Sequence, residues 1–329
     1  MKVIVTGGAG FIGSTFARHL VSKGDEYDVV VLDALTYAGR RASLDDIGSS
    51  IEFLHGDICD PEAVEAAMAG CDAVVHFAAE SHVTRSELDP GIFHRTNVEG
   101  TRTLLDTAVR LDVTRFVHVS TDEVYGDAAN GECFAEDAKE PGDHQATSAY
   151  AKSKSRADDL ALSYCDRLAL NVVRPTNNFG PFQFPEKALP RWITRVLRGE
   201  PISLWGVGEQ IRDWLYAPDT ASAVELVLRS APPGLAYNIG ANHTPEIKNR
   251  DLAHWVLGSL REHGARIEHQ LDVREHHDFR YSVDTSRIRA LGWAPTSDVW
   301  DQFDRTCTWY ESSRDGWSPL VAEAEAIYQ

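Results

Sequence analysis

The chain begins with a glycine-rich turn between a short apolar strand, "KVIVT", and an amphipathic helix. Gly8, Gly10 and Gly13 have the spacing G-x-G-x-x-G, and Gly7 adds the spacing G-x-x-G-x-x-G. Apolar residues then recur at helical spacing over residues 11–23. Glycines at such a turn let the backbone and the helix N-terminus approach a pyrophosphate. This context predicts the first strand–helix unit of a dinucleotide-binding fold.

Apolar runs and helical stretches alternate along the first half of the chain. The runs "YDVVVLD", "IEFLHGDI", "DAVVHFAA", "RFVHVS" and "LALNVVRP" predict five further strands, and helices are expected at 60–70, 98–110 and 150–167. Near-continuous apolar strands that alternate with helices indicate a parallel sheet covered on both faces. The expected fold class is therefore α/β, a doubly wound parallel sheet of Rossmann type.

The alternation of apolar strands and helices becomes less regular after residue 176, where proline and aromatic residues become more frequent. Helices are expected there at 187–198, 219–230 and 250–263. We therefore expect a nucleotide-binding domain over residues 1–176 and a smaller, mixed α/β substrate-binding domain over 177–329. A segment near 212–240, which contains the strand-like run "AYNIG", could return to the first domain.

Charge and composition narrow the possible partners. The chain has 32 Lys and Arg against 50 Asp and Glu, a net charge of −18, which disfavours binding to nucleic acid. No apolar run approaches the roughly 18 residues that a membrane span needs. The start of a strand at Lys2 leaves no room for a signal peptide, and the five scattered cysteines show no metal-ligand spacing. We expect a cytoplasmic protein with reduced thiols, without a metal site and without a membrane partner.

Two acidic residues at strand ends suggest how a dinucleotide is held. Asp33 ends the second strand, 20 residues after the last glycine of the turn. A carboxylate there accepts hydrogen bonds from the adenosine ribose and repels a 2′-phosphate, which favours NAD over NADP. Arg40 and Arg41 keep NADP open as the alternative. Asp57, where the third strand ends, could bond the adenine amino group; as a helix cap, Asp60 fits better.

Tyr150 and Lys154 lie one turn apart on one face of a predicted helix. A lysine near a tyrosine lowers the pKa of the phenol and can also bond the nicotinamide ribose. The phenolate can then accept a proton from a substrate hydroxyl while a hydride leaves for the cofactor. After a dinucleotide-binding start, this pair predicts the oxidation of an alcohol.

The fifth strand runs into two adjacent carboxylates, Asp122 and Glu123, directly after Thr121. A buried strand seldom ends this way, because each charge costs several kcal/mol to desolvate unless it is paired. Ligands bind in the crevice at the carboxyl ends of such strands. One protonated acid and one carboxylate base would suit an elimination of water. The alternative is a helix cap or a surface turn.

Motifs along nearly the whole chain carry a family resemblance. They are "VTGGAGFIGS", "LDALTYAG", "HGDICD", "HFAAESHV", "TNVEGT", "STDEVYG", "YAKSK", "NNFGPFQFPEKALP", "GEQIRDWLY", "YNIG" and "HHDFRYSVD". The chain resembles the dTDP-glucose 4,6-dehydratase family of extended short-chain dehydrogenases/reductases. The Thr-Asp-Glu triplet is the specific feature, because related 4-epimerases and decarboxylases usually carry Ser or Thr without the acid pair.

The resemblance implies an NAD-dependent hydro-lyase with a role for each of five residues. Tyr150 would deprotonate the C4 hydroxyl of a nucleotide-linked hexose with the help of Lys154, and NAD⁺ would take the C4 hydride. Thr121 would bond the C4 oxygen. Glu123 would remove the C5 proton and Asp122 would protonate the leaving C6 hydroxyl. Return of the hydride to C6 would leave a 4-keto-6-deoxy sugar and NAD⁺.

The resemblance also implies two sets of binding residues. Those for NAD are Gly7, Gly10, Phe11, Ile12, Gly13, Asp33, Leu35, Thr36, Asp57, Ile58, Phe77, Ala78, Ala79, Ser81, Thr96, Tyr150, Lys154 and Asn178. Those for the nucleotide sugar are Ser81, Thr121, Asn177, Lys187, Ala188, Ser203, Trp205, Arg212, Asn249, Arg274, and His277. The arginines suit a pyrophosphate, and Trp205 would stack on the base. A surface ion pair for each arginine and a core position for Trp205 are the alternatives.

Several departures from the family pattern leave the substrate open. Thr84 replaces the usual Asp, His276 replaces a Gly, and Ala149 stands for a Pro before the tyrosine. "RPT" precedes the Asn pair where the family often has small or thiol residues. The nucleobase, the state of the hexose and the pathway therefore stay unassigned.

Two rival functions remain open on sequence grounds. One is a 4-epimerase or decarboxylase of the same superfamily, which the acid pair disfavours. The other is a non-catalytic NAD-binding regulator, although such proteins commonly lose the Tyr or the Lys. The resemblance further implies a homodimer that pairs the helices at 98–110 and 150–167 across a two-fold axis.

Overall fold

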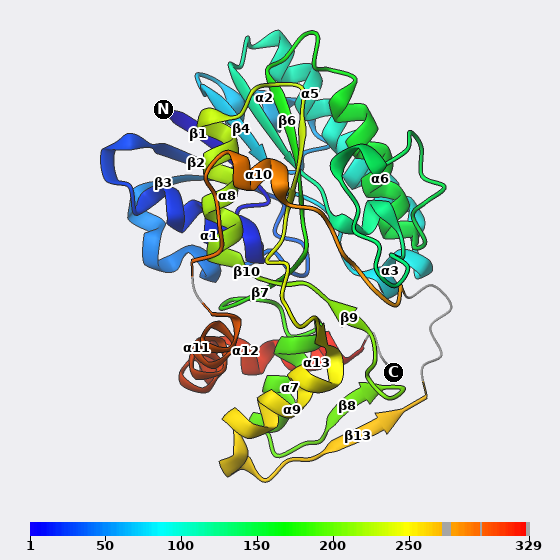
Figure 1. Cartoon of the computed structure of the whole chain (residues 1–329). Coiled ribbons are helices and arrows are strands. Elements are labelled where there is room, and N and C mark those ends of the chain that lie inside the picture. The colour runs from blue at the N-terminus through cyan, green and yellow to red at the C-terminus, as the bar shows by residue number, and fades with distance from the viewer. Residues whose placement is uncertain (272–277, 297, 327–329) are drawn as a thin grey trace.

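A seven-stranded parallel sheet forms the upper lobe of the computed structural model, which describes residues 1–271, 278–296 and 298–326 (Figure 1). Its neighbouring strands are all parallel, and the order reverses between the first and fourth strands. This reversal confirms the predicted doubly wound, Rossmann-type α/β class. In spatial order the strands are β11 (Ala236–Ile239), β6 (Leu170–Pro175), β5 (Arg115–Val119), β4 (Ala73–His76), β1 (Lys2–Thr6), β2 (Asp28–Asp33) and β3 (Ile51–His55).

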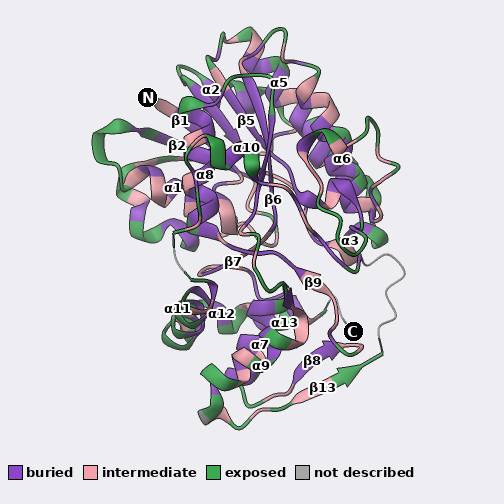
Figure 2. Ribbon diagram, in the orientation of Figure 1, coloured by how far each residue is buried: buried purple, intermediate pink, exposed green. Residues whose placement is uncertain are grey.

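Helices cover both faces of this sheet, because its strands are apolar on both sides. Along β1, Val3 and Val5 belong to one buried cluster and Ile4 to the other. The first cluster contains side chains of α1 (Phe11–Val21) and α8 (Ala217–Ser230). The second contains side chains of α2 (Pro61–Met68), α5 (Thr101–Arg110) and α6 (Ala149–Leu162). Figure 2 shows the strands as a buried layer between helices whose outer sides are exposed.

Local signals explain where these helices begin and end. Asp60 caps α2 by accepting a hydrogen bond from the Glu62 amide, and Ser148 caps α6 in the same way through the Ala151 amide. The α6 helix ends at Leu162, five residues before the predicted end. Beyond it the chain tightens into i→i−3 turns, and the hydroxyl of Tyr164 donates to Asp106 of α5.

The lower lobe packs helices and short strand pairs around a separate aromatic core (Figure 1). Phe179, Trp214 and Phe303 meet there, with the rings of Phe179 and Phe303 4.3 Å apart. The helices are α7 (Ala188–Leu197), α9 (Asn249–Ser259) and α11 (Val299–Ser312). The paired strands are β7 (Asn177–Phe179) with β10 (Trp214–Tyr216), β8 (Ile202–Trp205) with β13 (Ile267–Gln270), and β9 (Ile211–Arg212) with β12 (Ile247–Lys248).

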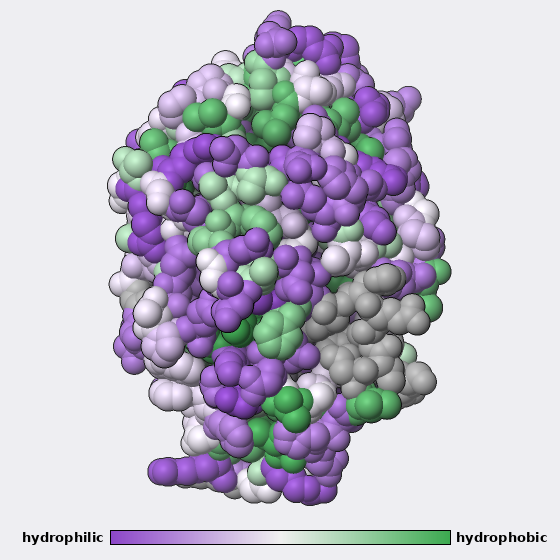
Figure 3. All heavy atoms as spheres, turned by 45° about the vertical axis from the view of Figure 1, so that its right-hand side comes forward, coloured by the Kyte–Doolittle hydropathy of each residue, from purple (hydrophilic) through white to green (hydrophobic). Residues whose placement is uncertain are grey.

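Short helices complete the described chain. They are α3 (Val83–Leu88), α4 (Pro90–His94), α10 (Ser286–Ala290), α12 (Arg314–Trp317) and α13 (Val321–Ala326), a π-helical segment Arg95–Gly100, and 3₁₀ segments Gly24–Glu26, Arg41–Ser50, Asp122–Tyr125, Glu136–Ala138, Arg261–His263 and Ser318–Leu320. Among the described residues, no helix is both long and apolar enough to span a bilayer. On the face in Figure 3, hydrophobic atoms form separate patches within a mainly hydrophilic surface.

Candidate active site

A cavity of about 1000 Å³ lies at the carboxyl edge of the sheet. Its wall includes the glycine turn after β1, the ends of β2 to β6, and parts of α6, α7 and β8 to β10. The cavity therefore borders the point where the strand order reverses, which is where doubly wound sheets bind ligands.

The glycine turn forms a cradle that has no room for side chains. A Cβ atom on Gly13 would lie 2.2 Å from the carbonyl oxygen of Gly7, and one on Gly7 would lie 2.5 Å from the amide nitrogen of Ala78. Gly7 also has φ of +69°, which disfavours other residues. The α1 helix begins after Gly10 without a side-chain cap, and Phe11, Ile12 and Gly13 of its first turn line the cavity. The cradle fits the pyrophosphate of a dinucleotide.

Asp33 is held at the end of β2 by two backbone amides. Its Oδ2 accepts from Ala9 at 2.8 Å and its Oδ1 accepts from Leu35 at 2.8 Å. Arg40 donates to the carbonyl of Gly316 at 2.9 Å, and the Arg41 guanidinium lies over the ring of Phe53, 4.6 Å from its centre.

The Arg40 guanidinium is thus taken up by a protein carbonyl, whereas Nη1 of Arg41 has no hydrogen-bond partner within the described part of the chain. Asp57 lines the same end of the cavity and bonds the Cys59 amide at 2.9 Å and Arg95 at 2.7 Å.

The acid pair forms a 3₁₀ turn capped by Thr121. The Thr121 hydroxyl accepts from the Glu123 amide and donates to Oδ1 of Asp122, each at 3.3 Å. Oδ2 of Asp122 is buried and has no hydrogen-bond partner within the described part of the chain. The turn is thus both a capped strand end and part of the cavity wall, so the two interpretations of the acid pair are compatible.

Burial raises the pKa of both acids. It raises the pKa of Asp122 well above its ordinary value, and the negative charges of Glu123 and Asp213 raise it further. Burial also raises the pKa of Glu123, to about 7. The raised pKa of Asp122 suits a proton donor, and Glu123, with a pKa of about 7, can act as a base near neutral pH.

Tyr150 and Lys154 reach the cavity from α6 and are both buried. Lys154 Nζ donates to the carbonyl of Val119 at 2.8 Å. Burial, followed by the charge of Glu123, raises the pKa of Tyr150, and burial lowers the pKa of Lys154 to about 8. The predicted lowering of the Tyr150 pKa by Lys154 is therefore not seen, because burial has the larger effect.

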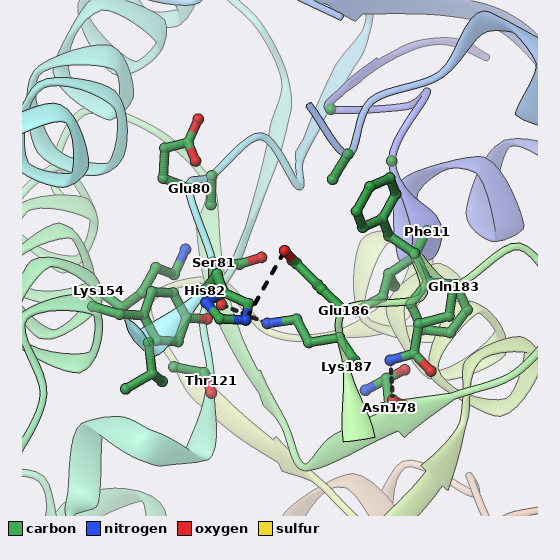
Figure 4. A pocket seen from close by; sticks show the side chains of 18 of the residues that line it. Phe11, Glu80, Ser81, His82, Thr121, Lys154, Asn178, Gln183, Glu186 and Lys187 are labelled. Carbon is green, nitrogen blue, oxygen red and sulfur yellow. Dashed lines mark hydrogen bonds and ion pairs between the residues drawn. The ribbon is translucent and has the colours of Figure 1, made fainter. Parts of the chain in front are cut away.

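Charged side chains just before α7 and in β9 line another part of the cavity wall. Lys187 Nζ donates to the carbonyl of Ser81 at 2.7 Å, and Figure 4 shows Lys187 and Glu186 reaching toward Ser81 and His82 across the cavity. Oε1 of Glu186 accepts from the hydroxyl of Tyr37 at 2.9 Å. Arg212 is buried, with its guanidinium 4.3 Å from the centre of the Tyr281 ring.

Residues 3–240 match the NAD dependent epimerase/dehydratase family. The chain belongs to this family. Among curated relatives, the dTDP-glucose 4,6-dehydratase of Streptomyces griseus is 44% identical over 97% of each chain. A low-salt glycan biosynthesis protein, Agl12 of Haloferax volcanii, is 40% identical over 94% of this chain and 98% of its own. The family resemblance predicted from the motifs is confirmed.

Solved structures of epimerase/dehydratase family members share the fold over nearly the whole chain. DesIV of Streptomyces venezuelae, a dTDP-glucose 4,6-dehydratase with NAD and dTDP bound, has a TM-score of 0.91 at 41% identity and covers 97% of this chain and 100% of its own. The UDP-glucose 4-epimerase of Thermus thermophilus, complexed with NAD, has a TM-score of 0.86 at 28% identity. The match covers 95% of this chain and 100% of the epimerase chain.

Most of the residues predicted for this epimerase/dehydratase site line the cavity. They are all five predicted catalytic residues and Gly7, Gly10, Phe11, Ile12, Gly13, Asp33, Thr36, Asp57, Ile58, Phe77, Ala78, Ala79, Ser81, Thr96, Asn177, Asn178, Lys187, Ala188, Trp205, Arg212 and Asn249.

Four predicted residues are not placed on the cavity wall. Leu35 packs against the core of the sheet, and its backbone amide donates a hydrogen bond to Asp33. Ser203 is buried within β8, where its carbonyl accepts from Trp192 and its hydroxyl from Gln270. Arg274 and His277 lie outside the described residues, as does His276.

Sequence reasoning missed several polar residues of the cavity wall. Glu80, His82, Gln183, Glu186, Arg191 and Tyr281 line it beside the predicted set. Five of them stand in motifs that the resemblance already contained, "HFAAESHV", "NNFGPFQFPEKALP" and "HHDFRYSVD". The polar residues within those motifs could therefore have been predicted as part of the cavity wall.

Proposed function

We propose that the protein is an NAD-dependent nucleotide-sugar 4,6-dehydratase that converts dTDP-glucose, or a close nucleoside-diphosphate hexose, to the 4-keto-6-deoxy sugar. The observation that carries the proposal is the buried acid pair on the same cavity as Tyr150, in which burial raises the pKa of Asp122 well above its ordinary value and the pKa of Glu123 to about 7. An epimerase needs no such pair. The full-length similarity to dTDP-glucose 4,6-dehydratases supports the same substrate class.

Tyr150 takes the proton of the C4 hydroxyl. Thr121 lines the same cavity as Tyr150, and its hydroxyl positions the C4 oxygen. Lys154 has a pKa of about 8, so its side chain stays largely protonated at pH 7. The chemistry that bound NAD supplies is reversible hydride transfer, first from C4 and finally to C6.

The two acids then carry out the two proton transfers of the elimination, one each. A 4-keto group makes the C5 hydrogen acidic, and the carboxylate of Glu123 removes it. Asp122 donates its proton to the C6 oxygen, which leaves as water. The strongly raised pKa of Asp122 suits a general acid, which must start protonated, and the pKa of about 7 lets Glu123 act as a general base, which must start ionised.

The remaining cavity residues hold the two nucleotides. The glycine turn, Asp33 and Asp57 hold NAD, on the domain that we propose for residues 1–176. Arg212 holds the pyrophosphate of the substrate, while Trp205 stacks on its base, on the domain that we propose for 177–329. The return of α8 and β11 to the first lobe makes this division discontinuous.

The proposal is tested with a panel of dTDP-, UDP-, CDP- and GDP-hexoses and mass measurement of the products. We expect the loss of one water from the dTDP-hexose. An epimer or a pentose product would instead favour the rival enzymes, and retention of NAD without turnover of any substrate would favour a regulator.

Purified protein is expected to retain NAD(H), because the reaction returns the cofactor to its starting state. Heat release followed by chromatography should give NAD⁺ or NADH in proportion to protein. Recovery of NADP(H) instead would contradict the assignment of the ribose site to Asp33.

The activity should rise with pH through the pKa of Glu123. Its carboxylate is the active form, so a pKa raised to about 7 moves the acid limb of kcat/KM up to about pH 7. The profile is measured between about pH 5 and pH 9, with circular dichroism to confirm that the protein stays folded. A limb that stays near the ordinary glutamate pKa of about 4.3 would contradict the role of Glu123 as base.

We also propose a cytoplasmic homodimer formed through α5 and α6, which lie side by side in each chain. The five free cysteines suit a reducing compartment. Light scattering should give about twice the chain mass of 36.4 kDa. A mass of one chain at working concentration would contradict the dimer.

A further inference from the structure

The two lobes meet at a tyrosine on the wall of the active-site cavity. Tyr37 follows β2 in the upper lobe, whereas Phe184 and Glu186 belong to the segment between β7 and α7 of the lower lobe. The Tyr37 hydroxyl donates to Oε1 of Glu186 at 2.9 Å, and its ring packs edge to face on Phe184, with the ring centres 5.7 Å apart. Tyr37 therefore contacts the same lower-lobe segment twice.

Arg85 of α3 contacts both residues of this hydrogen bond. Its guanidinium lies over the Tyr37 ring, 4.0 Å from the ring centre, and its Nε is 3.5 Å from Oε2 of Glu186. The side chain of Glu186 is only 1% exposed. A buried carboxyl is costly unless polar partners surround it, so the contacts with Tyr37 and Arg85 hold Glu186 in one position.

The turn that carries Tyr37 packs against Asp33, the residue assigned to the adenosine ribose of NAD. The Gly39 amide donates to the Thr36 carbonyl at 3.1 Å, and a Cβ atom on Gly39 would lie 2.6 Å from Oδ1 of Asp33. Thr36, Tyr37 and Gly39 all line the cavity. A ribose held by Asp33 would therefore lie next to the turn that carries Tyr37.

The other end of the hydrogen bond lies beside a residue assigned to the nucleotide sugar. Lys187 follows Glu186 directly, and its Nζ donates to the carbonyl of Ser81 at 2.7 Å. Figure 4 shows both side chains extending into the cavity from the same stretch of chain. Because Glu186 and Lys187 share a peptide bond, a shift of one displaces the backbone of the other. Glu186 thus lies between the cofactor side and the substrate side of the cavity.

We propose that the hydrogen bond between Tyr37 and Glu186 couples the two ligand sites, so that NAD and the nucleotide sugar strengthen each other's binding. The turn of Tyr37 is fixed when NAD is bound, the hydrogen bond carries this constraint to Glu186, and Lys187 is thereby held where the nucleotide sugar binds. Such coupling is reciprocal, so a bound nucleotide sugar also slows the loss of NAD. Tyr37 and Glu186 are positioning residues in this account. The inference rests on the proposed function, in which Lys187 binds a nucleoside-diphosphate sugar.

The proposed reaction needs its cofactor to stay bound between the two hydride transfers. Loss of the cofactor in that interval would leave the sugar oxidised at C4 and unable to complete the cycle. A contact that tightens cofactor binding while a nucleotide sugar is present prevents this loss, and it still lets NAD exchange when the substrate site is empty.

The test measures how fast the purified, NAD-loaded protein releases its cofactor with and without dTDP. We choose dTDP because it carries the nucleoside diphosphate but has no sugar that could react. Released NAD⁺ is trapped by an excess of alcohol dehydrogenase with ethanol, and the NADH formed is followed by its fluorescence. Saturating dTDP should slow release from the parent by about 5-fold or more, the lower end of typical coupling factors.

Two substitutions remove the hydrogen bond from opposite ends. Tyr37→Phe removes the hydroxyl but keeps the ring on Phe184, and Glu186→Met removes the acceptor. In each variant the release rates with and without dTDP should agree within about 2-fold, and the double variant should behave like either single one, because one hydrogen bond can be lost only once. Glu186→Gln keeps an oxygen that can accept from the hydroxyl and should retain the slowing by dTDP.

Tyr27→Phe is the matched control. The Tyr27 hydroxyl donates to Oε1 of Glu225 at 2.8 Å, a hydrogen bond of the same kind within the upper lobe, and neither residue lines the active-site cavity. This variant should keep the slowing that the parent shows. In turnover, Tyr37→Phe should raise the KM for dTDP-glucose by about 5-fold or more, with a smaller effect on kcat, because the lost contact orders the site and does not take part in the chemistry.

Three results would overturn the coupling. One is parent-like slowing by dTDP in both Tyr37→Phe and Glu186→Met, which would show that dTDP only blocks the exit of NAD. The others are a parent whose NAD release is not slowed by dTDP, and a Tyr27→Phe control that loses the slowing as well. If the parent shows the expected slowing but dehydrates no nucleoside-diphosphate hexose, the proposed function fails and the coupling stands.

Discussion

Replacing Tyr150 by phenylalanine is expected to stop the reaction before the sugar is oxidised. The variant keeps the buried ring but loses the hydroxyl that takes the C4 proton. Loss of a general base typically costs about 10²- to 10⁴-fold in rate. The near-ultraviolet absorbance of reduced nicotinamide should stay flat when dTDP-glucose is added, and no 4-keto sugar should form.

A matched control lies in the segment that follows α6, the helix that carries Tyr150. Tyr164→Phe removes a hydroxyl that bonds Asp106 of α5, and Tyr164 does not line the cavity. It should turn over at the parent rate. Parent-like turnover by Tyr150→Phe would show that another group removes the C4 proton.

Asp122→Asn and Glu123→Gln should each allow the oxidation at C4 and block the elimination. Neither change removes Tyr150 or Lys154, so reduced nicotinamide should accumulate with substrate while dehydrated product falls by about 10²- to 10⁴-fold. Solvent deuterium separates the two roles. Glu123→Gln should suppress exchange at C5 because the base is gone, whereas Asp122→Asn should retain it.

The control for the acid pair is Asp137→Asn, which removes an exposed carboxylate a short way along the chain. It should leave product formation unchanged. If Asp122→Asn and Glu123→Gln also turn over at the parent rate, the pair is only the end of a strand and the dehydratase assignment fails.

The sheet could be predicted because its signals are local. Each strand is a short apolar run between turn residues, and the glycine turn fixes how β1 enters α1. The end of α6 was placed five residues too late, because no Gly or Pro stops it. There the chain continues in tight turns whose stability comes from the contact of Tyr164 with α5. The helices at 83–94 were not predicted, because they are short and weakly periodic.

The catalytic part of the site could be predicted, because the positions of its residues along the chain place them at a strand end or on one helix face. Thr121, Asp122 and Glu123 follow β5 directly, and Tyr150 and Lys154 share one face of α6. The raised pKa of Tyr150 was not predictable, because it depends on burial that only the packed structure supplies. The hydrogen bond between Tyr37 and Glu186 was also hidden, because it depends on where segments far apart in the sequence pack together.

The fate of the hydrogen on C4 tests the central claim most directly. The protein is incubated with dTDP-glucose that carries deuterium at C4, and the product is examined by mass spectrometry and NMR. A 4,6-dehydratase should give a product that has lost water and carries the deuterium at C6. Deuterium found again at C4 of a sugar that has kept its water, with inverted configuration, would contradict the account and identify a 4-epimerase.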